Sequence, residues 1–238
     1  MMASRNASFH DDVLVGVLYW PLRFAFTLAL AMVTVLVFAW VVDWVFVFKV
    51  WPEGVEHLRH ILAMDLAYGL DLAERQGNVL DVVTLSANLL YELVFEVTGF
   101  HDMGMRFSEG GALSIPDTVV RNAYLAKRDE IEVAMIATQL LGVRIGTLLL
   151  MSALLLLVYV VAAADGLTER AIRRASGGRE SSGLYHRAKY MQIVALGTVG
   201  LAVILWPAPV GWESVMVLLA VVMFFFVRLQ WTYYKKHL

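Results

Sequence analysis

The sequence contains no cysteine and few charged residues. The lack of cysteine excludes disulfide bonds, catalytic thiolates and cysteine-ligated metal sites. Charged residues make up only 17% of the chain, whereas hydrophobic residues make up 60%. The mean hydropathy is +0.68, and soluble domains are only about half apolar. The composition therefore excludes an ordinary soluble domain and predicts a protein that lies in a lipid bilayer.

Four apolar runs are the candidates for membrane-spanning segments. About 20 apolar residues cross the hydrocarbon core of a bilayer as a helix. Helices are expected because every backbone polar group in such a segment must be hydrogen-bonded within the protein. No stretch has the alternating pattern of a strand. The predicted fold class is therefore all-α, a polytopic membrane protein with four transmembrane helices and a helical periplasmic domain between the first and second. The four runs cover residues 22–42, 145–164, 191–206 and 215–227.

The last two runs are predicted to form a hairpin. Pro207 and Pro209 mark a turn between them. Trp206 and Trp212 flank this turn, and tryptophan prefers the interface between membrane and water. Both indole rings are therefore expected at the depth of the lipid headgroups.

Basic residues between the second and third runs predict the orientation in the membrane. Residues 165–189 contain six basic residues against three acids, and the chain ends in YYKKHL. Short loops rich in lysine and arginine stay on the cytoplasmic side. Both termini are therefore expected on the cytoplasmic side of a multi-pass membrane protein.

The spans and their orientation together predict five segments. The first contains the cytoplasmic N-terminus and a transmembrane helix, and the second is a helical periplasmic domain. A second transmembrane helix and a basic cytoplasmic loop follow, and the last segment is the transmembrane hairpin with the cytoplasmic C-terminus. In chain order, these segments cover residues 1–48, 49–144, 145–164, 165–189 and 190–238.

Within the periplasmic segment, two amphipathic helices are predicted, one from about Pro52 and one from Leu80. Their apolar residues recur at intervals of three and four, which is typical of a helix with one buried face. Gly77 is expected to separate them. The glycine-rich stretch 99–111 is expected to be a loop. A third helix from about Ser114 could run straight into the second span.

Residues that could carry chemistry are sparse. His57 and His60 lie near Glu53 and Glu56, but their spacing matches no zinc motif. No serine lies in a nucleophile elbow. No catalytic residue, metal site or cofactor is therefore predicted, and the protein is not expected to be an enzyme.

Charged and small residues near the outer ends of the spans predict helix contacts. Asp43 and Arg144 lie at the outer ends of the first and second runs, where anchoring or mutual pairing is favoured over ion conduction. Gly142 and Gly146 form a GxxxG spacing, which lets helices approach closely. This helix packing is expected either within the bundle or between protomers.

The stretch GGRESSGLYHRAKY, residues 177–190, gathers basic, hydroxyl and aromatic side chains in one place. It lacks the GKS or GKT ending of a phosphate-binding loop. Two interpretations stay open. The cations could contact anionic lipid headgroups, or arginine and aromatic anchors could dock a protein partner. The candidate partner-binding residues in and near this stretch are Arg173, Arg174, Arg179, Glu180, Tyr185, His186, Arg187 and Lys189.

Three stretches of the sequence resemble those of a known family. They are VFKVWPEGVEHLRHIL after the first run, DGLTERAIRR at the end of the second, and GRESSGLYHRAK before the third. With the layout of four spans, they resemble bacterial integral membrane proteins encoded in integrative conjugative elements and related plasmids, typically beside the type IV coupling ATPase. The resemblance implies a setting in conjugative DNA transfer and a partner, without implying catalysis.

The predicted function is therefore that of an accessory inner-membrane subunit of a conjugative type IV secretion apparatus, which binds or positions the coupling ATPase during DNA transfer. Other secretion-apparatus subunits and anionic membrane lipid are further expected partners, and a homo-oligomer stays open. No direct sequence-specific contact with nucleic acid is expected. The main alternative is a small transporter or channel subunit, which the near absence of charge in the apolar runs disfavours. A ligand sensor is a third alternative, for which no pocket signature is visible.

Overall fold

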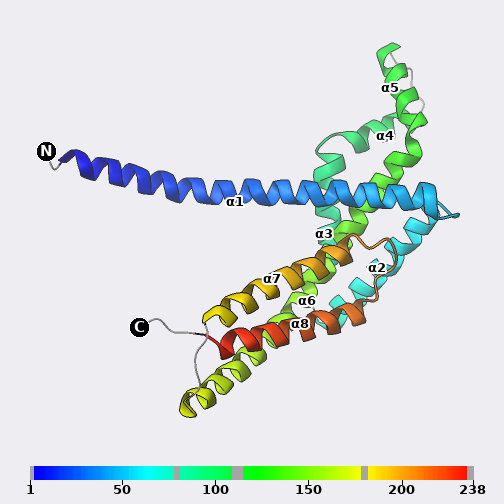
Figure 1. Cartoon of the computed structure of the whole chain (residues 1–238). Helices are drawn as coiled ribbons and strands as arrows, with labels where there is room; N and C mark the ends of the chain where they lie inside the picture. Colours follow the sequence, from blue (N-terminus) through cyan, green and yellow to red (C-terminus); the bar gives the residue numbers. More distant parts are fainter. Residues whose placement is uncertain (1–2, 78–80, 109–114, 178–181, 235–238) are drawn as a thin grey trace.

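The computed structural model describes residues 3–77, 81–108, 115–177 and 182–234. Every regular element in these four stretches is a helix, which confirms the predicted all-α class. The chain begins with the long helix α1 (Ala3–Val45), which continues through the π-helical segment η1 (Phe46–Val50). The remaining elements form an outer group of helices and a hairpin on one very long helix (Figure 1).

In the described part of the chain, four helices are long and apolar enough to cross a membrane, in agreement with the four predicted spans. They are α1 with η1, then α6 (Arg128–Ala175), α7 (Ser182–Ile204) and α8 (Trp212–Thr232). A bent pair of shorter helices, Val82–Glu96 and Phe100–Phe107, meets the same test of length and composition across a bend of 71°. The sequence pattern did not predict this pair.

The helices extend well beyond the apolar runs. α6 contains 48 residues and continues on both sides of the predicted span 145–164. α7 starts at Ser182, so most of the segment expected to be a basic loop, residues 165–189, is helical. A helix does not have to stop where its apolar run stops, because polar residues such as Glu, Arg and Lys are also good helix formers. α6 ends before Gly177, whose positive φ of 73° suits glycine.

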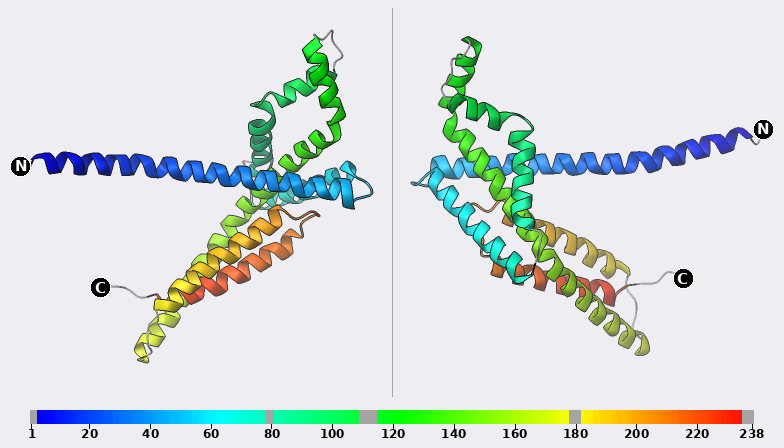
Figure 2. Two further views of the ribbon diagram at one scale, coloured as in Figure 1. Left: turned by 45° about the horizontal axis from the view of Figure 1, so that its top comes forward. Right: turned by 180° about the vertical axis from the view of Figure 1, so that it is seen from behind.

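The outer helices lie between η1 and α6 in chain order. They are α2 (Val55–Arg75), α3 (Val82–Tyr91) with the π-helical segment η2 (Glu92–Glu96), α4 (Phe100–Ser108) and α5 (Ile115–Ala126). α2 and α3 both lie along α6, whereas α4 and α5 project away from the bundle (Figure 2). As predicted from the sequence, α2 ends close to Gly77, which has a φ of 63°.

The prediction of a glycine-rich loop over residues 99–111 is wrong for its first part. Phe100–Ser108 is the helix α4, and residues 109–114 lie outside the described part of the chain. Gly104 is helical and lies against α5, because a Cβ atom there would approach the hydroxyl of Tyr124 to 2.5 Å. Phe107 of the same helix packs against the Tyr124 ring at 5.7 Å. Gly104 therefore lies within a helix, against the end of the Tyr124 side chain, and does not open a loop.

α6 is shared by all three hydrophobic cores. The first core joins the end of α1 and α2 to α6, through residues such as Val47, Leu58 and Val133. The second joins α2 and α3 to α6, and the third joins Met151 of α6 to the α7–α8 hairpin. The C-terminal part of α1 contacts α6, as in the hydrogen bond from Trp40 to Thr138. Toward its own N-terminus, α1 diverges from α7 and α8 (Figures 1 and 2).

Candidate functional site

The end of α6, the start of α7 and the end of α8 meet at one end of the bundle, which we call the basic end (Figure 1). α6 and α8 approach closely there because of Gly166. A Cβ atom at this position would lie 2.6 Å from the carbonyl oxygen of Arg228 and 2.9 Å from Cβ of Trp231. The close contact holds the last turns of the two helices side by side.

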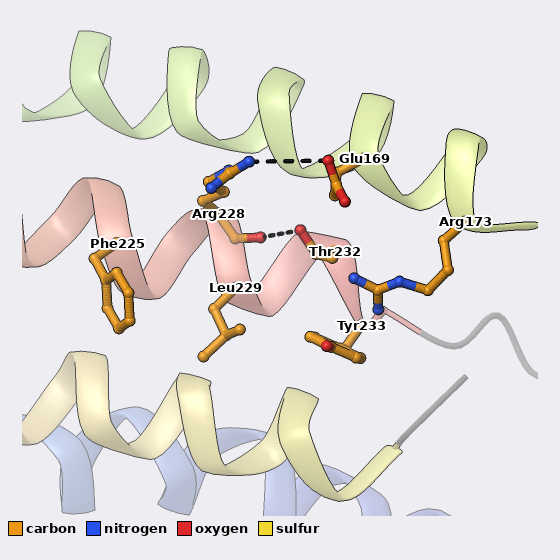
Figure 3. Close-up of a pocket in the computed structure, with 7 residues that line it drawn as sticks. All are labelled: Glu169, Arg173, Phe225, Arg228, Leu229, Thr232 and Tyr233. Carbon is orange, nitrogen blue, oxygen red and sulfur yellow. Dashed lines mark hydrogen bonds and ion pairs between the residues drawn. The ribbon is translucent and has the colours of Figure 1, made fainter. Parts of the chain in front are cut away.

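Ion pairs join α6 to α8 at the basic end. Arg228 of α8 pairs with Asp165 and lies 3.9 Å from Glu169, and both acids belong to α6 (Figure 3). All three side chains are about half exposed, so each pair adds little to stability. The two carboxylates nevertheless offset the positive charge of Arg228.

Arginine side chains of α6 stack on tyrosine rings that follow α8. The guanidinium carbon of Arg173 lies 4.1 Å from the centre of the Tyr233 ring, and that of Arg170 lies 5.4 Å from the centre of the Tyr234 ring. Tyr185 of α7 meets the edge of the Tyr234 ring at a centroid distance of 5.6 Å. Such contacts are attractive and fix the orientation of long side chains. We call these five residues the arginine–tyrosine cluster.

The cluster brings together two of the predicted partner-binding residues, Arg173 and Tyr185. The others are arranged around it. His186 contacts the Tyr185 ring edge-on at 5.2 Å, and Arg174 lies exposed on α6. Arg187 and Lys189 are exposed on α7, and Arg179 and Glu180 lie outside the described residues. We did not predict a role for Tyr233 and Tyr234 from the sequence. Two adjacent tyrosines shortly after an apolar run were a usable signal.

At the opposite end of the bundle, which we call the turn end, Arg144 is completely buried in a network of hydrogen bonds. Its Nε donates to Oδ2 of Asp65 at 2.8 Å. Nη1 donates to the carbonyl oxygens of Ile204 and Trp206 at 3.1 and 2.5 Å, and Nη2 to that of Ala208 at 2.9 Å. The other carboxylate oxygen of Asp65 accepts a hydrogen bond from the backbone N–H of Val210 at 3.0 Å. One ion pair therefore ties α2 and α6 to the α7–α8 turn.

Anchoring or mutual pairing was expected for Asp43 and Arg144, and the structure shows no direct ion pair between these two described residues. The partner of Arg144 is Asp65, and the two side chains are only 2% and 1% exposed. Asp43 is also buried, on α1. Asp65 is the favoured partner because its carboxylate accepts hydrogen bonds from Arg144 and from the turn backbone at the same time. Arg144 in turn donates to carbonyl groups at and after the end of α7 that have no partner within the helix.

The two tryptophans beside the turn have different environments. Trp206 is 55% exposed, as expected for a ring at the membrane interface, whereas Trp212 is 1% exposed. The Trp212 ring stacks on Tyr68 of α2 at a centroid distance of 6.2 Å, so it packs inside the protein instead of facing lipid headgroups. The depth of both rings in the membrane stays a prediction. Burial raises the pKa of the Tyr68 phenol above its ordinary value, and the nearby charge of Glu213 raises it further.

Gly142 and Gly146 face α3 of the same chain. A Cβ atom at Gly142 would lie 2.5 Å from Cα of Ala87, and one at Gly146 would lie 2.7 Å from Cα of Val83. Both contacts are with backbone, which cannot move aside as a flexible side chain can. The GxxxG pair therefore lies where α3 crosses α6 at backbone contact distance.

The histidines of the outer helices lie in separate places. His57 pairs with Glu53 at 3.2 Å and packs on Trp51, whereas His101 is hydrogen-bonded to Tyr91 at 2.9 Å. Within the described ranges, no three histidine, aspartate or glutamate side chains come together in a way that could hold a metal ion.

Comparison with known proteins identifies one family. Residues 50–232 of the 238 match the family described as "IncC plasmid conjugative DNA transfer protein DtrJ-like". The match runs from the end of η1 to the last residue of α8, so it includes the turn end and most of the basic end. No curated protein and no solved structure matches the chain. A match over this much of the chain means that the protein belongs to the DtrJ-like family of conjugative DNA transfer proteins.

Proposed function

We propose that the protein is a non-catalytic accessory subunit of the conjugative type IV secretion apparatus in the bacterial inner membrane, and that its basic end docks the coupling ATPase in the cytoplasm. The family supplies the role in conjugative DNA transfer. The observation that supports docking is the arginine–tyrosine cluster, in which Tyr185 is held against Tyr234 beside the arginines of α6. Arginine and tyrosine are enriched among the residues that dominate protein interfaces.

The basic end suits docking because its side chains stand on helices instead of a flexible loop. α6 continues to Ala175 and α7 begins at Ser182, so the basic residues of both helices have fixed positions. Side chains that are already ordered lose less conformational entropy when a partner binds. His186, Arg187 and Lys189 on α7 extend the surface next to the cluster.

The cytoplasmic location of the basic end is supported by its charge. The described part of this end contains Arg170, Arg173, Arg174, Arg187 and Lys189, and the positive-inside rule keeps such segments in the cytoplasm. α1 also begins on the side of the bundle that carries the basic end (Figure 1). Both chain ends would then lie in the cytoplasm, with α2 to α5 on the periplasmic side.

This orientation is tested with reporters of membrane topology. A reporter inserted after Gly177, between α6 and α7, is expected to be active as a cytoplasmic fusion, and one inserted at Gly104 in α4 as a periplasmic fusion. The physical reason is the excess of cations at the basic end. Alkaline phosphatase and green fluorescent protein activities at both sites provide the measurement. Finding the two sites on the same side would contradict the four-span arrangement.

Docking is tested by removing one ring from the cluster. Tyr185→Ala is expected to reduce co-purification of the coupling ATPase by about tenfold or more, because aromatic anchors of interfaces often contribute 2 kcal/mol or more. DNA transfer between cells should fall in parallel. Tyr190→Ala is the matched control, because Tyr190 lies on the same helix, is 67% exposed and belongs outside the cluster.

A second pair of variants separates docking from simple charge attraction. Arg179→Ala removes one cation of the stretch 177–190, whereas a shuffled version of this stretch keeps every cation but changes their order. Docking predicts that both variants lose the ATPase, because an interface depends on which residue is where. Normal transfer and ATPase recovery with the shuffled stretch would refute docking and leave a cationic surface that only contacts lipid.

A further inference from the structure

A groove of about 160 Å³ lies on the surface of α8 at the basic end. Its apolar part is formed by Phe225 and Leu229, which lie one turn apart along α8 and lead toward Tyr233 (Figure 3). Its polar part lies at the last turn of α8, where the end of α6 contributes Arg173. The groove thus changes from apolar to cationic along the axis of a helix that is apolar enough to span a membrane. The lining residues are Glu169, Arg173, Phe225, Arg228, Leu229, Thr232 and Tyr233.

The two arginines of the groove differ in their partners. Arg228 pairs with Asp165 and Glu169, which offset its charge. Arg173 stacks on the Tyr233 ring and has no carboxylate within ion-pair distance among the described residues. Stacking uses the face of the guanidinium and leaves N–H donors along its edge for oxygen atoms. Arg173 is therefore a positioned cation beside an apolar groove.

We propose that this groove binds an anionic phospholipid, with the lipid phosphate at Arg173 and an acyl chain against Phe225 and Leu229. A soluble phosphate ion would not use the apolar part of the groove. An acidic peptide would have to enter the membrane depth of Phe225. The small volume also suits a lipid, because the rest of the molecule stays in the bilayer. The groove shares Arg173 and Tyr233 with the arginine–tyrosine cluster, but Tyr185 does not line it. Lipid binding is measured without the ATPase, so failure of the lipid site and failure of docking are distinguishable.

The lipid site is tested by native mass spectrometry of the full-length protein in detergent, titrated with phosphatidylglycerol or phosphatidylcholine. Arg173→Gln is expected to weaken the tightest phosphatidylglycerol binding by about fivefold, the effect of one cation near a membrane surface. Arg174→Gln is the matched control, because it removes the same charge one residue away and does not line the groove. Phosphatidylcholine has the same phosphate but no net charge, so it should bind the wild type more weakly and lose less affinity than phosphatidylglycerol in Arg173→Gln.

Three results would overturn this site. Equal losses in Arg173→Gln and Arg174→Gln would show a general attraction of anionic lipid to the basic end. Unchanged binding in both variants would place the lipid elsewhere. Displacement of phosphatidylglycerol by millimolar inorganic phosphate would identify a soluble phosphate site instead.

A second variant tests the apolar part of the groove separately. Leu229→Trp fills the groove with a larger side chain and leaves every charge in place. It is expected to weaken binding of long-chain phosphatidylglycerol while sparing a short-chain form with the same headgroup. Equal affinity of wild type and Leu229→Trp for the long-chain lipid would contradict an acyl chain at Phe225 and Leu229. Circular dichroism of each variant establishes that the helices are intact before lipid binding is compared.

Discussion

Replacing Arg144 with alanine is expected to destabilise the folded protein by about 3–5 kcal/mol, the range for breaking a buried ion pair by removing one partner. The change leaves the Asp65 carboxylate buried without its counterion. It also leaves the carbonyl groups of Ile204, Trp206 and Ala208 without their donor. Asp65 belongs to α2, Ile204 ends α7, and the other two carbonyl groups lie in the α7–α8 turn. Without Arg144, the turn should therefore separate from α2. Thermal unfolding in a mild detergent, followed by circular dichroism, measures the loss.

Arg75→Ala is the matched control for this prediction. Arg75 pairs with Asp71 at 2.8 Å, but the two side chains are 73% and 51% exposed. An exposed pair within one helix contributes less than about 1 kcal/mol. The control should therefore unfold at nearly the wild-type temperature. Similar losses of stability for Arg75→Ala and Arg144→Ala would show that burial does not increase the contribution of the Arg144–Asp65 pair.

A double variant separates the two roles of Arg144. In Asp65→Leu with Arg144→Met, no charge is left buried, and such apolar replacements of buried pairs are often well tolerated. Here the turn carbonyls still lose their donor, at a cost of about 1–3 kcal/mol for each group that water cannot reach. Stability between that of the wild type and that of Arg144→Ala is expected. Full recovery would mean that the hydrogen bonds to the turn are dispensable.

Replacing Gly142 with leucine is expected to have an effect of similar size through a different cause. Even the Cβ atom would lie 2.5 Å from Cα of Ala87 and 2.8 Å from the carbonyl oxygen of Ser86. Overpacking a core costs about 1–3 kcal/mol and sometimes more, and here the obstacle is the backbone of α3. We expect α3 to detach from α6, which limited proteolysis of the purified protein would detect between α2 and α4.

Gly197 provides the matched control, because a Cβ atom there would meet nothing within 4 Å. In a helix, alanine is intrinsically favoured over glycine by up to about 1 kcal/mol. Gly197→Ala should therefore leave stability unchanged or raise it, whereas Gly142→Ala should lower it. Opposite changes in stability for the same glycine-to-alanine substitution would show that contact with α3 decides the outcome. If both variants gained stability, α3 would not be in backbone contact with α6.

The number and type of membrane-spanning helices followed from composition, because each span must be apolar over a nearly fixed length. The break near Gly77 was also visible, because glycine readily adopts the positive φ found there. The partner of Arg144 was not visible. Asp65 is 79 residues away in sequence and lies in a helix whose pattern shows only which face is buried. Such a pairing depends on tertiary packing.

Gly104 and the arginine–tyrosine cluster also show that tertiary packing cannot be predicted from the sequence pattern. Gly104 was interpreted as part of a loop, but a glycine within a helix and one that allows a turn look alike in sequence. Arg173 and Tyr185 were among the candidate site residues, whereas Tyr233 and Tyr234 were counted only as part of a basic C-terminus. The tyrosines become recognisable as a site only when α8 runs back beside α6.

The unbroken length of α6 has a mechanical consequence. No proline interrupts its 48 residues, and Arg144 and Arg173 lie on the same rod, roughly 44 Å apart at the rise of an α-helix. A rod clamped at one end acts as a lever. A tilt of about 5° at the Arg144 network would carry the Arg173 end sideways by roughly 4 Å, which is more than enough to break a hydrogen bond. Force applied to α2 at the turn end would thus displace the arginine–tyrosine cluster at the basic end.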